Sequence, residues 1–270
     1  MILKRITLIP FALLIGLSIL FVGCGTDSDT GSGTMTVEMA DAPIDSADAV
    51  NVFIESVEVN REGSSDGWVT LNEPQQEYDL LELTNGATTI IGSSELEAGT
   101  YQQIRLILSQ DGHSVEVDGR SYDMKVPSGP ETGIKLNINA EIQEDIEYVL
   151  LLDFDASRSV VKAGQNNPAV QYLLKPVISA TEKAITGNIE GTVDPFEAQP
   201  VVYAIAGSDT LTSTIADTSD GYFKLIGLEE GTYDVSVNPR NDTYSEKTVT
   251  DVDVTVENTS ELGTIELPQN

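Results

Sequence analysis

The sequence has few of the residues that most often carry enzymatic or metal chemistry. Its 270 residues include one cysteine, one histidine and one tryptophan. A single cysteine excludes a disulfide within the chain, and the common zinc and iron sites need more Cys and His ligands than are present. A Ser-His-Asp or Cys-His arrangement would have to use His113, and no Gly-x-Ser-x-Gly motif accompanies it. We therefore predict that the protein is not an enzyme.

Positive charge is also scarce. The chain has 14 Lys and Arg residues against 44 Asp and Glu residues, a formal net charge of -30. Phosphate backbones are repelled by such a chain, so nucleic acid is not expected as a partner. No phosphate loop or dinucleotide-binding fingerprint is found. The acidity suits solubility, a salty environment or loose association with divalent cations, and it does not choose among them.

The N-terminus has the pattern of a secretory signal peptide. Lys4 and Arg5 precede an uncharged apolar run over residues 6–21. This run is shorter than the roughly 18 apolar residues of a spanning helix, and Pro10 interrupts it. We expect the segment to be removed rather than to remain as a transmembrane helix.

Cys24 follows this run directly. The stretch Phe21-Val-Gly-Cys24 resembles a bacterial lipobox, although leucine is more usual at the first position. The resemblance implies a signal peptide over residues 1–23 and lipidation of Cys24 as the mature N-terminus. The alternative is an ordinary cleavage site with a chance cysteine, but a lone thiol would be a liability in an oxidising compartment. We predict an extracytoplasmic protein held in membrane lipid through Cys24. If the host is diderm, we expect it at the outer membrane or cell surface, because the residue after Cys24 is Gly25 and not the aspartate that is typical of retention in the inner membrane.

Beyond a flexible tether over residues 24–33, the pattern predicts strand after strand. The apolar phase changes between Ile54 and Val57, which predicts a β-bulge, and Asp118-Gly119 predicts a two-residue hairpin turn. Residues 148–154 are apolar on both phases, as in a central strand covered on both faces. Residues 171–178 are predicted to form one last strand of the first unit, and residues 79–83 a short helix.

The strand pattern restarts near residues 183–187, which divides the folded part at this point. We predict an all-β fold of two antiparallel β-sandwich domains, of immunoglobulin or prealbumin-like type, over residues 34–183 and 184–270. A short repeat, residues 96–101 and 228–233, places Tyr101 and Tyr233 each at the start of a strand. This arrangement predicts a tyrosine corner in both units, in which the hydroxyl bonds to the preceding loop.

Two stretches resemble known families. Gly-Thr-Val at 191–193, Asp-Gly-Tyr-Phe-Lys-Leu-Ile-Gly-Leu at 220–228 and Glu-Gly-Thr-Tyr-Asp-Val at 230–235 make the second unit similar to the carboxypeptidase regulatory-like, or transthyretin-like, domain. That resemblance implies a seven-stranded accessory sandwich without catalytic residues. The first unit resembles a domain of unknown function, family four-three-eight-two, common in prokaryotic lipoproteins; the resemblance rests on residues 39–45, 67–71, 78–86, 98–106 and 151–161.

Acidic and aromatic side chains offer the candidates for a site. Asp153 and Asp155 follow a buried strand, where alternate carboxylates are able to meet Ca²⁺, and an Asx-type turn ending the strand is the favoured alternative. Asp217 and Asp220 present the same choice in the second unit. Trp68 and the tyrosines are candidates for a sugar-stacking platform or, more simply, core residues. Glycosidase-type carboxylate pairs are not excluded by composition.

Taken together, these features predict a non-catalytic cell-envelope lipoprotein that binds or scaffolds at the membrane surface. One alternative is a structural or adhesion protein stabilised by Ca²⁺, and another is a carboxylate-dependent enzyme acting on glycans. We expect no resident cofactor other than a possible Ca²⁺ ion. The expected partners are membrane lipid through Cys24 and an envelope polysaccharide or protein.

Overall fold

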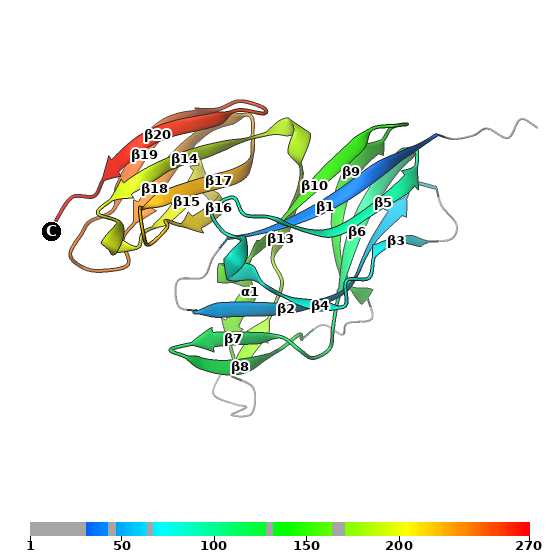
Figure 1. Ribbon diagram of the computed structural model, residues 1–270, viewed down its shortest axis with the longest axis horizontal. Helices are drawn as coiled ribbons and strands as arrows, with labels where there is room; N and C mark the ends of the chain where they lie inside the picture. The colour runs from blue at the N-terminus through cyan, green and yellow to red at the C-terminus, as the bar shows by residue number, and fades with distance from the viewer. Residues whose placement is uncertain (1–30, 43–46, 64–66, 128–131, 164–170) are drawn as a thin grey trace, which may run out of the picture. The chain divides into compact units, whose positions relative to one another are not determined.

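The computed structural model describes residues 31–42, 47–63, 67–127, 132–163 and 171–270. The predicted signal peptide, Cys24 and the tether through Thr30 lie outside this range. Residues Gly31–Asn270 form one compact unit. It contains two hydrophobic cores, one drawn from residues 35–174 and the other from residues 189–267. The prediction of an all-β fold built from sandwiches is confirmed (Figure 1).

Two sheets enclose the first core (Figure 1). The smaller has the strand order β13-β10-β1-β5, and the larger the order β11-β12-β8-β7-β2-β6-β9, with β3 and β4 also paired to β2. The strands are β1 (Ser32–Ala42), β2 (Ala49–Arg61), β3 (Trp68–Asn72), β4 (Gln76–Asp79), β5 (Thr89–Glu97), β6 (Gly99–Leu108), β7 (Ser114–Val117), β8 (Arg120–Lys125), β9 (Ile134–Ile142), β10 (Glu147–Asp155), β11 (Val160–Lys162), β12 (Tyr172–Leu174) and β13 (Ile178–Glu182).

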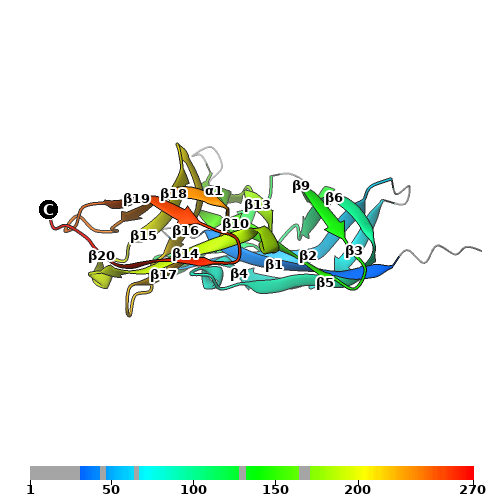
Figure 2. The same ribbon diagram turned by 90° about the horizontal axis from the view of Figure 1, so that it is seen from above.

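The second sandwich pairs β17-β14-β20 with β16-β15-β18-β19, and these sheets form separate layers in Figure 2. Its strands are β14 (Thr186–Asp194), β15 (Val201–Ala206), β16 (Asp209–Ile215), β17 (Tyr222–Glu229), β18 (Gly231–Asn238), β19 (Lys247–Val254) and β20 (Thr259–Glu266). The described helices are single turns: η1 (Leu80–Leu83), α1 (Ala156–Ser159), η3 (Lys183–Ile185) and η4 (Phe196–Ala198). Within the described part of the chain, no helix is long and apolar enough to cross a membrane.

Both sandwiches contain parallel strand pairs. β1 pairs with β10, β12 with β8, and β14 with β20 in parallel orientation, and the other pairs are antiparallel. Period-two alternation places side chains on the same faces in either orientation, so the sequence pattern does not distinguish the two. The central strand β10 is covered on both faces, as predicted: Leu150 and Leu152 pack in the first core, while Leu151 on the opposite face is also buried.

Several local predictions are confirmed. The pairing of β2 with β6 shifts register between Ile54 and Ser56, where the bulge was expected. The β7–β8 hairpin turns at Asp118 and Gly119, both with positive φ as a type I′ turn requires. Asp79 accepts a hydrogen bond from the N–H of Leu81 at 3.1 Å, which caps η1 at the place where a short helix was predicted.

The two tyrosine corners are confirmed as well. The hydroxyl of Tyr101 donates to the carbonyl oxygen of Glu97 at 3.1 Å, and that of Tyr233 to the carbonyl oxygen of Glu229 at 2.8 Å. Burial raises the pKa of both phenols, so both remain protonated donors at neutral pH. The repeated hexapeptide thus builds the same loop-to-strand tie in each sandwich.

One predicted strand is wrong. The strand expected over residues 171–178 is divided between β12 and β13, which lie in different sheets, and Pro176, which has no N–H to donate, stands in the crossover. The first described strand, β1, begins at Ser32, so Ser32 and Gly33, which were expected in the tether, are part of it. Gly33 pairs with Leu96 in β5, and a Cβ there would lie 2.1 Å from the carbonyl oxygen of Gln143. Gly33 therefore serves close packing rather than flexibility.

Candidate functional site

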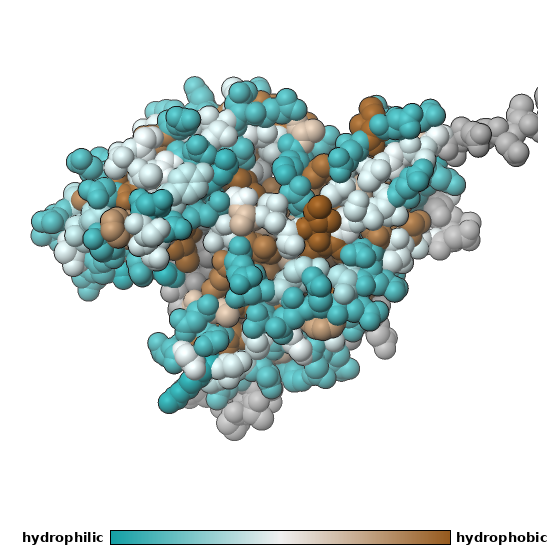
Figure 3. All heavy atoms as spheres, in the orientation of Figure 1, coloured by the Kyte–Doolittle hydropathy of each residue, from teal (hydrophilic) through white to brown (hydrophobic). Residues whose placement is uncertain are grey.

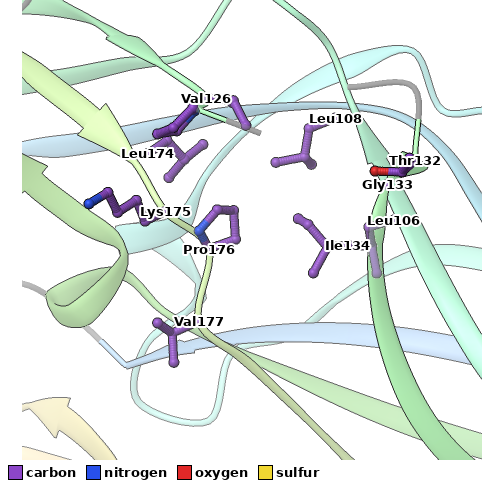
Figure 4. A pocket seen from close by; sticks show the side chains of 11 residues that line it. Leu106, Leu108, Val126, Thr132, Gly133, Ile134, Leu174, Lys175, Pro176 and Val177 are labelled. Carbon is purple, nitrogen blue, oxygen red and sulfur yellow. The ribbon is translucent and has the colours of Figure 1, made fainter. Parts of the chain in front are cut away.

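A largely apolar pocket of about 530 Å³ opens in the first sandwich (Figure 4). It lies beside the crossover from β12 to β13, where the chain leaves one sheet for the other. Leu108 ends β6 and Ile134 begins β9, and Figure 4 shows Pro176 of the crossover between Leu174 and Ile134. The remaining lining residues are Leu106, Val126, Pro127, Thr132, Gly133, Lys175 and Val177.

The volume of this pocket falls within the range of about 300–1,000 Å³ that is usual for ligand sites. Among the described residues of the lining, Lys175 supplies the only charged side chain and points away from the other lining side chains in Figure 4, while Thr132 supplies a hydroxyl. The surface seen in Figure 3 is mostly hydrophilic, with hydrophobic side chains in small groups. The pocket is therefore suited to bury an apolar group and offers few hydrogen bonds to a sugar.

Asp153 and Asp155 do not form a shared oxygen site. The Asp155 carboxylate accepts hydrogen bonds from the N–H of Arg158 at 2.9 Å and the hydroxyl of Ser157 at 2.6 Å, and so caps α1. This is the turn that the sequence favoured for Asp155. Among the residues that the structure describes, no group of three or more His, Cys, Asp or Glu side chains is placed to hold a metal ion.

Asp153 instead faces the second sandwich. The hydroxyl of Thr212 hydrogen-bonds to its carboxylate, and its Oδ1 is shielded from solvent without a partner. Burial raises the pKa of Asp153 to about 6, and the negative charge of Asp155 adds to the shift. This carboxyl is therefore largely ionised at neutral pH in surroundings that disfavour its charge.

Asp41 is a buried carboxyl that reasoning from the sequence missed. Its Oδ1 accepts from the N–H of Ala156 at 3.0 Å, while Oδ2 is buried without a partner. Burial raises the pKa of Asp41 well above its usual value, and the charge of Asp153 raises it further. The sequence does contain a signal for it. Asp41 lies in the stretch 35–42, in which every second side chain enters the core.

The cavity that Asp41 and Asp153 both line is too small for acid-base chemistry on a glycan. It holds about 10 Å³, roughly the room that one water molecule needs. A glycosidase pair must admit a sugar ring between its two carboxyl groups. The glycan-acting alternative therefore gains no support from this pair.

His113 has a structural place. It is buried, its Nδ1 accepts from the N–H of Phe53 at 3.1 Å, and its Nε2 lies 2.8 Å from the carbonyl oxygen of Ser109. Burial lowers the pKa of the imidazole, which keeps it neutral. Nδ1 thus ties the loop after β6 to β2, and Nε2 makes a hydrogen bond within that loop.

The other singled-out residues are also engaged locally. The guanidinium of Arg105 lies 4.3 Å from the ring centroid of Trp68, a cation–π contact that occupies the ring surface a sugar would need. Asp217 accepts from the N–H of Ser219 at 2.7 Å, and Asp220 accepts from the N–H of Tyr222 at 2.9 Å. Both aspartates are therefore turn residues.

Asn85 joins the two sandwiches. The sequence predicted a turn at Asn85-Gly86, and both residues have positive φ. The Asn85 side chain reaches β17, where its Nδ2 donates to the carbonyl oxygen of Tyr222 at 3.1 Å and its Oδ1 accepts from the N–H of Lys224 at 3.0 Å. The hydroxyl oxygen of Thr214 on β16 accepts a hydrogen bond from the N–H of Asn85 at 2.8 Å.

Residues 32–176 match the family model described as a domain of unknown function, DUF4382. The chain belongs to this family. The DUF4382 domain thus contains the apolar pocket, apart from Val177 at its edge, together with Asp41 and Asp153. None of the curated proteins matches the chain.

Solved structures similar to this DUF4382 protein include three from Gram-positive bacteria. The TIE protein of Bacillus anthracis is 10% identical with a TM-score of 0.24; the alignment covers 88% of this chain and 35% of that one, so the chain spans about a third of its length. The minor pilin GBS52 of Streptococcus agalactiae is 11% identical, with a TM-score of 0.23; the alignment covers 87% of this chain and 96% of the pilin. The shaft pilin spaA of Lactobacillus rhamnosus is 10% identical, with a TM-score of 0.26; the alignment covers 89% of this chain and 98% of the pilin.

Proposed function

We propose that this DUF4382 protein is a non-catalytic cell-envelope lipoprotein, anchored through acylated Cys24, that binds a protein partner at the membrane surface. The observation that carries the proposal is the apolar pocket of the first sandwich. We propose also that residues 34–183 form the binding domain and residues 184–270 an accessory sandwich of the carboxypeptidase regulatory-like kind.

The lining of the pocket favours an apolar group of a protein over a polysaccharide. Burying apolar surface contributes about 25 cal/mol per Å², so filling the space between Leu108, Ile134 and Leu174 is favourable. A saccharide placed there would lose its hydrogen bonds to water and regain few from these walls. An apolar side chain of an envelope protein is the occupant that fits.

A photo-crosslinking amino acid at Thr132 tests this proposal in the native host. Thr132 is exposed and lies on the pocket rim, so we expect it to crosslink to one discrete envelope protein. Val126→Asp, which places a charge in the pocket wall, should reduce that crosslink at least tenfold. Val69→Asp is the matched control, because Val69 is 42% exposed on β3 and does not line the pocket, and it should leave the crosslink unchanged.

The same crosslinker at Thr248, an exposed threonine of β19, measures the background. Crosslinking from Thr132 no stronger than from Thr248, or equally strong in Val126→Asp, would contradict the proposal. The comparison requires that Val126→Asp and Val69→Asp are present at equal levels in the membrane fraction.

A further inference from the structure

A second hollow lies between the two sandwiches, on the face of β10 opposite the first core. It is a cleft of about 290 Å³, bounded by β10 and β13 on one side and by β16, β17 and β18 on the other. Leu151, Leu211 and Ile226 supply apolar surface, and the aliphatic hydroxyl residues Ser179, Thr181 and Thr212 supply polar groups. It shares no residue with the apolar pocket and is therefore a separate site.

The cleft contains an unsatisfied negative charge. Asp153 lines it, the unpartnered Oδ1 of this carboxylate is itself shielded from solvent, and none of the ion pairs among the described residues includes Asp153. Lys224 lies on β17 nearby, but its ammonium group is paired with the carboxylate of Glu190 at 2.9 Å. Because an uncompensated buried charge is costly, a cationic donor that enters the cleft would gain a charge-assisted hydrogen bond.

The surroundings of Asp153 decide which kind of cation fits. Ca²⁺ takes six to eight oxygen ligands, several of them carboxylates, whereas the described residues offer no group of three acidic or His and Cys side chains. An ammonium group needs three acceptors at most, and the carboxylate with the neighbouring hydroxyls provides them. The leucine and isoleucine walls then suit the carbon chain that carries it.

We propose that this cleft binds a primary ammonium group on a short apolar stem, with Asp153 as its counter-ion. The source is a free alkylamine or the lysine side chain of a peptide, which share this chemistry. A volume of about 290 Å³ lies at the lower limit of ligand pockets, so the occupant is of side-chain size. Leu211, 47% exposed at the cleft, would be covered by the stem, and exposed Glu229 adds negative charge.

The test is calorimetric titration of the detergent-solubilised full chain at pH 7.5 and constant ionic strength. The probes are n-pentylammonium chloride, Nα-acetyl-lysine methylamide and, as a neutral molecule of the same shape, n-pentanol. We expect at least one amine to bind at least tenfold more tightly than pentanol. The tighter of the two amines identifies a free amine or a peptide lysine as the source.

Asp153→Asn should weaken amine binding at least tenfold, because it removes the counter-ion and keeps the shape. Asp155→Asn is the matched control: it removes a carboxylate two residues away that does not line the cleft, and asparagine still caps α1. Binding in this control should stay within twofold of wild type. No binding of either amine at 10 mM, equal binding of pentanol, or unchanged binding in Asp153→Asn would each overturn the proposal.

Discussion

Asn85→Ala is expected to reduce the free energy of unfolding by about 2–4 kcal/mol. The change removes the hydrogen bonds of the side chain to Tyr222 and Lys224; the carbonyl of Tyr222 still accepts from the N–H of Asp217, whereas the N–H of Lys224 loses its side-chain partner. Each unsatisfied group costs about 1–3 kcal/mol when it is shielded from water. Alanine at a φ of 58° adds about 1 kcal/mol of backbone strain.

Urea unfolding followed by circular dichroism and by the fluorescence of Trp68, the only tryptophan, measures this loss. Asn85→Gly separates the two causes, since glycine tolerates positive φ but makes no side-chain bond. It should recover about 1 kcal/mol of the loss. A loss below 1 kcal/mol in Asn85→Ala would show that this contact between the sandwiches is unimportant for stability.

Asp153→Asn is expected to stabilise the protein at pH 7.5 by about 3 kcal/mol. The pKa of Asp153 is raised by burial to about 6 in the folded protein, against about 3.9 in an unfolded chain. The folded state therefore binds the proton more tightly, so this contribution to stability is fully present below pH 4 and is lost as the pH rises through 6. A difference of about 2 pH units corresponds to about 3 kcal/mol.

Other charges around Asp153 act in the same experiment. Asp155 on β10 and Glu229 on β17 are acidic, Lys224 on β17 is paired with Glu190, and Asp41 on β1 is a carboxyl whose pKa burial raises well above its usual value. The charge of Asp153 also raises the pKa of Asp41, so the difference between wild type and variant reports Asp153 together with its coupling to Asp41. The curves of unfolding free energy should coincide near pH 4 and separate between pH 4 and 6. Parallel curves, or a variant less stable at pH 7.5, would contradict the assigned burial.

A carboxylate that costs stability where it stands is consistent with a role in binding. Asparagine has the same shape as aspartate and would pack equally well at position 153. The native aspartate adds a charge that its surroundings leave unsatisfied. Stabilisation by Asp153→Asn together with loss of amine binding would connect the two observations.

The sequence predicted the strands whose alternation is strict and the turns whose chemistry is specific. The Asp118-Gly119 hairpin, the bulge after Ile54 and the two tyrosine corners depend on local conformation, which neighbouring residues determine. β16 is an example without such a signal, because every second residue of its central part is a threonine: Thr210, Thr212 and Thr214. One of these threonines, Thr212, meets Asp153 across the contact between the sandwiches.

The candidate sites were harder to predict, because their residues come together only across the packed sheets of the folded chain. The apolar pocket combines residues of β6, of the segment that follows β8, of the start of β9, and of the end of β12 with the β12–β13 crossover; these are distant in sequence and meet only through the pairing of the sheets. Asp153 was singled out, but with Asp155 as its partner, because the sequence shows neighbours along a strand and not the side chains that pack across it. Asp41 and Thr212 become neighbours of Asp153 only in the folded chain.

Anchoring of the protein in a membrane through Cys24 is the central proposal, and one measurement tests it directly. Cells expressing the wild type or Cys24→Ser are labelled with an alkyne analogue of palmitate and separated into membrane and soluble fractions. We expect the wild type to be labelled and almost entirely in the membrane fraction, because two or three acyl chains hold firmly. Cys24→Ser should be unlabelled and released; an unlabelled wild type, or a serine variant that stays in the membrane, would contradict the account.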